Sequence, residues 1–106
     1  MLQRYPLESM KEGDAYILND PYCGGTHLPD IAIMTPVFHH GRVIAMSATM
    51  THHGDVGGYS PGSLPTNSTE IYQEGLRIPV IRFVRQAHKM KAWWRCCARI
   101  HACRTR

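Results

Sequence analysis

The sequence of 106 residues has no long hydrophobic run, and it has no acidic residue beyond Glu74. No stretch approaches the roughly 20 apolar residues that a helix needs to cross a bilayer, so we expect no membrane span. The first residues lack a basic start followed by an apolar core, and we therefore expect no secretory signal and a cytoplasmic protein. Cysteine is also sparse: Cys23 stands alone and the other three lie between residues 96 and 103, which does not fit a disulfide framework.

The charge is divided along the chain. Residues 1–81 hold four basic and eight acidic residues, a net charge of −4, whereas residues 82–106 hold eight basic residues and no acid, a net charge of +8. The chain thus has two compositions, and at this length it is at most one small domain.

Short apolar runs bounded by turn residues predict a strand-rich α+β fold with long glycine- and proline-rich loops and one short helix. The third apolar run is continuous enough to suit a strand buried on both faces. A hairpin turn at residues 39–42 is expected to join the second strand to the third. The expected strands cover residues 15–18, 31–38, 43–50 and 76–84.

Two further local signals concern proline and helix capping. Pro36 would remove one hydrogen bond from its strand, which predicts a bend or an edge position. Asn67 and Glu70 have the spacing of a capping box, which predicts the start of the short helix, and Gly75 would end it.

Two loops bring histidine and aspartate to neighbouring strand ends. The first runs from Asn19 to Asp30 and the second from His52 to Gly58. If strands 31–38 and 43–50 pair as a hairpin, Asp30 lies near Thr51, and His27, Asp30, His52 and His53 can converge. Imidazole and carboxylate ligands without thiolate favour a divalent ion such as Mn, Fe or Zn in an open catalytic site. The alternative, ordinary surface turns that hold no metal, stays open.

Other reactive side chains receive a plainer interpretation. Asp20 precedes a proline, as aspartates that cap turns often do. His39 and His40 sit at the expected hairpin tip and are predicted to be solvated. Cys23 has no evident base nearby and is predicted to be a neutral loop thiol.

Three motifs, in this order and with this spacing, resemble the hydantoinase B/oxoprolinase family. They are GDAYILNDPYCGGTHLPD at residues 13–30, THHGDVGGYSPG at residues 51–62 and TEIYQEGLRIP at residues 69–79. The resemblance extends over residues 1–85 and implies that this part is a fragment of a larger cytoplasmic subunit.

The resemblance also implies an activity and a site. Members are catalytic subunits that work with a hydantoinase A-type partner, which uses ATP to activate the carbonyl of a cyclic amide such as 5-oxoproline or a hydantoin. Relatives carboxylate acetone or acetophenone. His27, Asp30, His52 and His53 would then hold a divalent metal (Mn, Zn or Fe), with Asp20 and Asp55 orienting the ligands or adding to them. A fragment of this size is expected to be inactive alone.

The last part of the chain, residues 86–106, crowds tryptophan, cysteine and arginine together without an acid. Codons for Ala87 to Arg104 can be chosen that, read from the third base, encode a capped, leucine-bearing helix that ends at proline and resembles the family's continuation. We therefore expect residues 1–85 to be a partial family domain and residues 86–106 to be a non-homologous basic tail that arose by a frameshift near codon 86.

Two alternatives for this tail stay open. Cys96, Cys97, His101 and Cys103 are potential zinc ligands, although adjacent cysteines seldom chelate one ion well. The basic residues and the tryptophan pair could instead make the chain a small nucleic-acid-binding module. We rank both below the frameshift.

Overall fold

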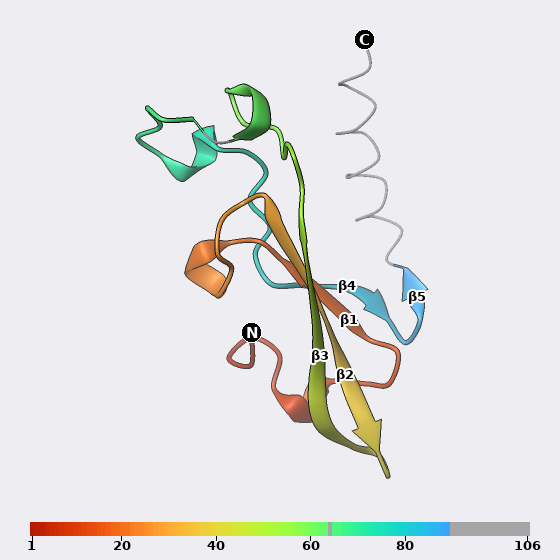
Figure 1. The fold of residues 1–106 in the computed structure, drawn as a ribbon. Coiled ribbons are helices and arrows are strands. Elements are labelled where there is room, and N and C mark those ends of the chain that lie inside the picture. The colour runs from red at the N-terminus through yellow and green to blue at the C-terminus, as the bar shows by residue number, and fades with distance from the viewer. Residues whose placement is uncertain (64, 90–106) are drawn as a thin grey trace.

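The computed structural model describes residues 1–63 and 65–89, and they form one antiparallel sheet of five strands (Figure 1). The order across the sheet is β3-β2-β1-β4-β5. The predictions for residues 90–106, including the zinc ligands and the nucleic-acid-binding residues, lie outside the described residues. The strands are β1 (Ala15–Leu18), β2 (Asp30–His39), β3 (Arg42–His52), β4 (Ile81–Arg85) and β5 (His88–Lys89).

The central strand β1 carries the core. All four of its residues are buried, and β2 pairs with one of its edges and β4 with the other. Leu18 packs with Ala32 and Val80 in a buried cluster. Met1, Tyr5, Cys23 and Met34 pack around that cluster. The strand predicted at residues 15–18 is therefore confirmed.

The long hairpin of β2 and β3 confirms the predicted pairing of these two strands. His40 and Gly41 have φ values of 46° and 75°, as a two-residue hairpin turn requires. Pro36 lies beyond Met34, the last residue of β2 that pairs with β1, so it occupies a local edge as predicted. A bulge follows between Val37 and Phe38.

The prediction that the third strand is buried on both faces was wrong. Ile44 and Met50 of β3 are 64% and 53% exposed. Strand β3 is last in the order of the sheet, and none of the described residues pairs with its outer edge. Apolar composition made this strand look interior, but the burial of its side chains depends on what covers the two faces of the sheet, and Ile44 and Met50 are left uncovered.

The helical elements among the described residues are single 3-10 turns, so the strand-rich part of the expected fold is confirmed and the α+β label is not. The helix predicted from Asn67 begins later, at Ile71, and its N-terminal cap is Glu70, whose backbone amide donates to the side chain of Gln73. The turns are η1 (Leu7–Ser9), η2 (Pro21–Cys23), η3 (Pro61–Ser63) and η4 (Ile71–Gln73).

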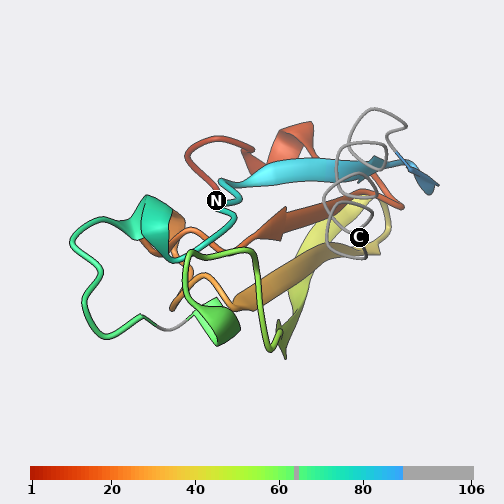
Figure 2. The same ribbon diagram turned by 90° about the horizontal axis from the view of Figure 1, so that it is seen from above.

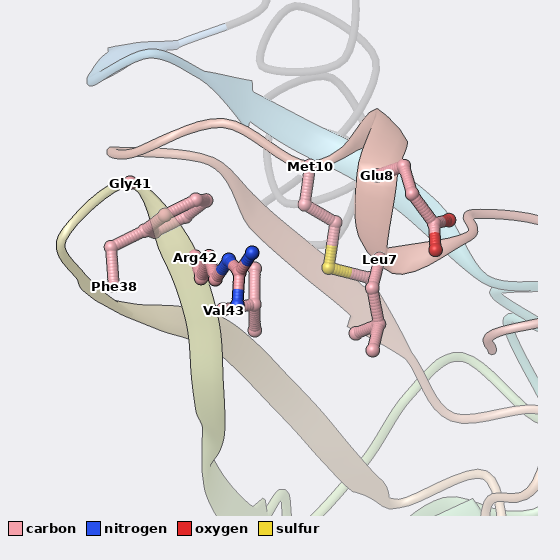
Figure 3. Close-up of a pocket in the computed structure, with 7 residues that line it drawn as sticks. All are labelled: Leu7, Glu8, Met10, Phe38, Gly41, Arg42 and Val43. Atoms are coloured by element: carbon pink, nitrogen blue, oxygen red, sulfur yellow. The ribbon is translucent and has the colours of Figure 1, made fainter.

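The loops that bear η2, η3 and η4 gather toward the end of the sheet opposite the β2–β3 hairpin turn (Figures 1 and 2). Near the hairpin turn, η1 borders an open pocket of about 410 Å³ (Figure 3). Its lining is Leu7, Glu8, Met10, Phe38, Gly41, Arg42 and Val43. None of the described residues forms a helix long and apolar enough to span a membrane.

Candidate metal centre

Asp30 and His52 face each other across the open end of the β2–β3 hairpin. Asp30 is the first residue of β2, His52 is the last of β3, and the two are register partners. Directly opposed residues of an antiparallel pair project from the same face of the sheet. Accordingly, Nδ1 of His52 lies 2.8 Å from Oδ1 of Asp30.

His27 joins this pair from the preceding turn, in which the amide of Asp30 donates to the carbonyl oxygen of His27 at 3.0 Å. Its Nε2 lies 3.2 Å from Oδ2 of Asp30, and its ring meets the ring of His52 edge to face with centroids 5.3 Å apart. One ligand atom from each of His27, Asp30 and His52 falls within 4.8 Å of the others. We call these three residues the His-Asp-His cluster.

The carboxylate of Asp30 is held ionised. Thr26 donates its hydroxyl to Oδ2 at 2.7 Å, and this bond, followed by that of His52, lowers the pKa of Asp30 below its usual value. At neutral pH the cluster therefore offers a negative oxygen beside two imidazoles. Sequence reasoning missed Thr26, because a threonine after a glycine pair looks like any loop residue.

The donor set fits a divalent ion. Two imidazole nitrogens and one carboxylate are the ligands of open catalytic sites, which leave positions for water or substrate. The side chains of His27 and His52 are 41% and 58% exposed, so the cluster is accessible. Nδ1 of His27 is buried without a hydrogen-bond partner among the described residues, while Nε2 is directed at the cluster.

The other residues predicted for the site lie apart from this cluster. His53 is exposed and is not one of the three grouped residues, and its amide donates to the carbonyl oxygen of Pro29 at 2.8 Å. Asp55 accepts bonds of 2.8 Å from the amide of Gly57 and the hydroxyl of Ser63. It thereby shapes the loop after β3. His39 and His40, which were predicted to be solvated rather than to join the site, are exposed at the hairpin tip, where their rings lie 4.1 Å apart.

Asp20 is buried and forms an ion pair with the partly exposed Arg77. Its side chain is 1% exposed and accepts a 2.7 Å bond from Nε of Arg77, whose guanidinium lies over the rings of Tyr22 and Tyr72. Burial alone would raise the pKa of Asp20, but the hydrogen bonds from Arg77 and from the amide of Tyr22 outweigh it and lower that pKa. Asp20 therefore joins the η2 loop to the segment before β4.

Ser63 is a second structural residue that the sequence did not reveal. It is fully buried at φ 52°, a left-handed conformation that is rare for serine. Its hydroxyl oxygen accepts from the amides of Val56 and Gly58 at 2.9 and 3.2 Å and donates to Asp55. The loop that follows His52 is fixed by these bonds.

Comparison with known proteins places the chain in a family. The family model described as hydantoinase B/oxoprolinase matches residues 1–105. The 5-oxoprolinase of Dictyostelium discoideum is 40% identical over 89 residues, which are 80% of this chain and 7% of that protein. The ATP-dependent caprolactamase of Pseudomonas jessenii superposes with a TM-score of 0.75 at 31% identity, over 84% of this chain and 15% of that one.

A nucleotide-free acetone carboxylase structure has the same fold over 92% of this chain and 13% of its own, with a TM-score of 0.79 and 24% identity. The chain thus spans a small part of the length of each of these relatives. The match over nearly the whole chain, together with these likenesses, confirms the resemblance found in the three motifs. The chain belongs to the hydantoinase B/oxoprolinase family.

Proposed function

We propose that this chain carries the metal-binding part of the catalytic unit of an ATP-dependent hydrolase that opens cyclic amides. The observation behind the proposal is the His-Asp-His cluster, whose three donor atoms lie within 4.8 Å of one another. The names 5-oxoprolinase and ATP-dependent caprolactamase among the relatives support the substrate class and the use of ATP. Because the chain spans 7% and 15% of these two relatives, it is expected to be inactive alone.

In the complete enzyme, a divalent ion held by the cluster would polarise a carbonyl or hold an activated oxygen nucleophile. The residues of this chain would supply three ligands, and Thr26 would keep the carboxylate of Asp30 oriented and ionised. A hydantoinase A-type partner would use ATP to activate the substrate carbonyl. We place the complex in the cytoplasm. The alternative function, nucleic-acid binding, depended on a tail of which residues 90–106 lie outside the described part of the chain.

The proposal is tested by titrating Mn²⁺, Zn²⁺ and Co²⁺ into the full chain and measuring affinity by calorimetry and by the visible absorption of bound Co²⁺. All variants carry His39→Ala, His40→Ala, Cys96→Ser, Cys97→Ser and Cys103→Ser, so that neither the hairpin tip nor the cysteines of the tail bind the probe. We expect His27→Ala, Asp30→Asn and His52→Ala each to weaken binding at least tenfold, a loss of about 1.4 kcal/mol or more.

His53→Ala is the matched control, because it removes a neighbouring exposed imidazole from outside the His-Asp-His cluster. We expect its affinity to equal that of the parent protein. A loss equal to that of His52→Ala would establish His53 as the fourth ligand predicted from the sequence. Equal affinity in all four variants would refute the proposed site.

A further inference from the structure

Asn19, the residue that follows β1, has all its side-chain bonding groups satisfied inside the protein. It is 0% exposed, and its Nδ2 donates to the carbonyl oxygens of Leu28 and Leu76, each at 2.7 Å. Its Oδ1 accepts from the amide of Ile78 at 2.6 Å, and its own amide donates to the carbonyl oxygen of Ile78 at 3.0 Å. One side chain therefore joins the end of β1 to two other stretches of backbone, the turn at Leu28 and the segment from Leu76 to Ile78.

One of these stretches belongs to the turn that bears two of the proposed ligands. Leu28 lies between His27 and Asp30, and its side chain is fully buried. Because its carbonyl oxygen is bound to Asn19, the peptide after Leu28 has a fixed orientation. The directions in which His27 and Asp30 leave the turn are fixed with it.

The second stretch leads to the loop that follows His52. The amide of Leu76 donates to the carbonyl oxygen of Val56 at 2.8 Å, and Gly57 and Gly75 form an isolated β-bridge. Leu76 thus contacts Asn19 through its carbonyl group and the loop of the third ligand through its amide. Asn19 therefore connects the turn of His27 with the segment that supports the loop after His52.

Only an amide of this length satisfies the three partners. They require two N–H donors and one acceptor, which asparagine supplies from a single planar group. Aspartate would place an acceptor-only carboxylate against two carbonyl oxygens, and serine offers one donor. Glutamine is one methylene longer, and because Asn19 is fully buried, the surrounding packing leaves no room for that methylene.

We propose that Asn19 is a positioning residue of the His-Asp-His cluster: it contacts no ligand atom, but it fixes the turn that bears His27 against the segment that braces the loop after His52. This inference rests on the proposed metal site. Loss of a group that hydrogen-bonds directly to a metal ligand typically weakens metal binding by about 10- to 100-fold, and we expect the lower end of this range for Asn19, which acts through the backbone of Leu28.

The test compares Asn19→Ser with Met10→Ala in the full chain, which carries the same background substitutions as the variants described above. Met10 is 4% exposed and lines the pocket near the hairpin turn, at the other end of β2 and β3 from Asp30 and His52. Met10→Ala therefore lowers stability without touching the ligand loops. Co²⁺ affinity and the visible spectrum of bound Co²⁺ are measured where each variant is folded, with trimethylamine N-oxide added to both if urea unfolding shows the need.

We expect Asn19→Ser to raise the Kd for Co²⁺ at least tenfold and to change the position or intensity of its visible bands. Met10→Ala should leave Kd and spectrum unchanged. A folded Asn19→Ser protein with parental Kd and spectrum would overturn the inference, whereas His52→Ala would still lose binding and leave the proposed site standing. If the parent protein and His52→Ala bind Co²⁺ equally, the proposed site fails, and this inference fails with it.

Discussion

Gly25 lies so close to the backbone of Asn19 that a single methyl group should disrupt the loop that holds His27. A Cβ at Gly25 would lie 2.4 Å from the carbonyl oxygen of Asn19 and 2.9 Å from that of Asp20. Neither oxygen belongs to a side chain that can turn away. The amide of Gly25 also donates to the carbonyl oxygen of Asp20 at 2.9 Å, so the two segments cannot separate without losing that bond.

The expected loss of stability follows from the backbone atoms that a Cβ at Gly25 would displace. Forcing one extra carbon into a packed site typically costs about 1–3 kcal/mol, and the upper end applies because only backbone can move here. We therefore expect Gly25→Ala to lower the free energy of unfolding by about 3 kcal/mol. Since small domains have urea m-values of about 1–3 kcal/mol/M, the midpoint should fall by roughly 1–3 M.

Two other glycines provide matched controls for this substitution. Gly24 has open space around a Cβ but a φ of 104°, so Gly24→Ala should cost about 1–2 kcal/mol through backbone strain alone. Gly54 has open space and a φ outside the left-handed region, so Gly54→Ala should be neutral or stabilise by up to about 1 kcal/mol.

The three variants are compared by urea unfolding at pH 7, followed by far-ultraviolet circular dichroism. The expected order of stability is Gly54→Ala, then Gly24→Ala, then Gly25→Ala. A Gly25→Ala protein as stable as Gly54→Ala would show that the turn between Asn19 and Gly25 is not packed as described. That result would also weaken the role assigned to Asn19.

Two further predictions concern burial and pH. Leu28→Ala should lower the free energy of unfolding in urea by about 2–5 kcal/mol, because Leu28 is 0% exposed. It should also weaken Co²⁺ binding, although it removes no ligand. Unchanged Co²⁺ affinity in the folded variant would contradict this prediction. The pKa of Asp20 is lowered from 3.8, so its ion pair with Arg77 stabilises the protein above about pH 4, and this stability is lost as the pH falls through the lower folded-state value. Asp20→Asn should therefore be less stable than the parent at pH 6. Between pH 6 and pH 2.5 the variant should lose less stability than the parent does, because it has no carboxylate at position 20 to protonate. Equal losses of stability in the two proteins over this range would contradict the prediction.

Local patterns in the sequence predicted the hairpin and, through it, much of the candidate site. Short apolar runs and a turn at residues 39–42 indicated that Asp30 would come near the end of the third strand. The expected neighbour was Thr51, whereas the structure pairs Asp30 with His52. Side chains of a strand alternate between faces, so this shift of one residue decides which of two adjacent histidines joins the cluster.

Long-range bonds decided what the sequence could not. A strand was predicted over residues 76–84, but β4 begins at Ile81, because the backbone groups of Leu76 and Ile78 bond to Asn19, which is 57 and 59 positions away along the chain. Ser63 and Asp55 likewise act through partners that no local spacing identifies. Composition shows which residues can bond, but it does not show which ones meet.

The sequence by itself determined the family, through three ordered motifs, and the ligand types available to a metal, through the histidines and aspartates of two loops. Only the tertiary structure decided which of them lie together, and it assigned Asp20 to an ion pair with Arg77 rather than to the cluster. The physical reason is that ligand chemistry is a property of single side chains. Distances between them depend on strand register and on buried hydrogen bonds between segments that are remote in the chain.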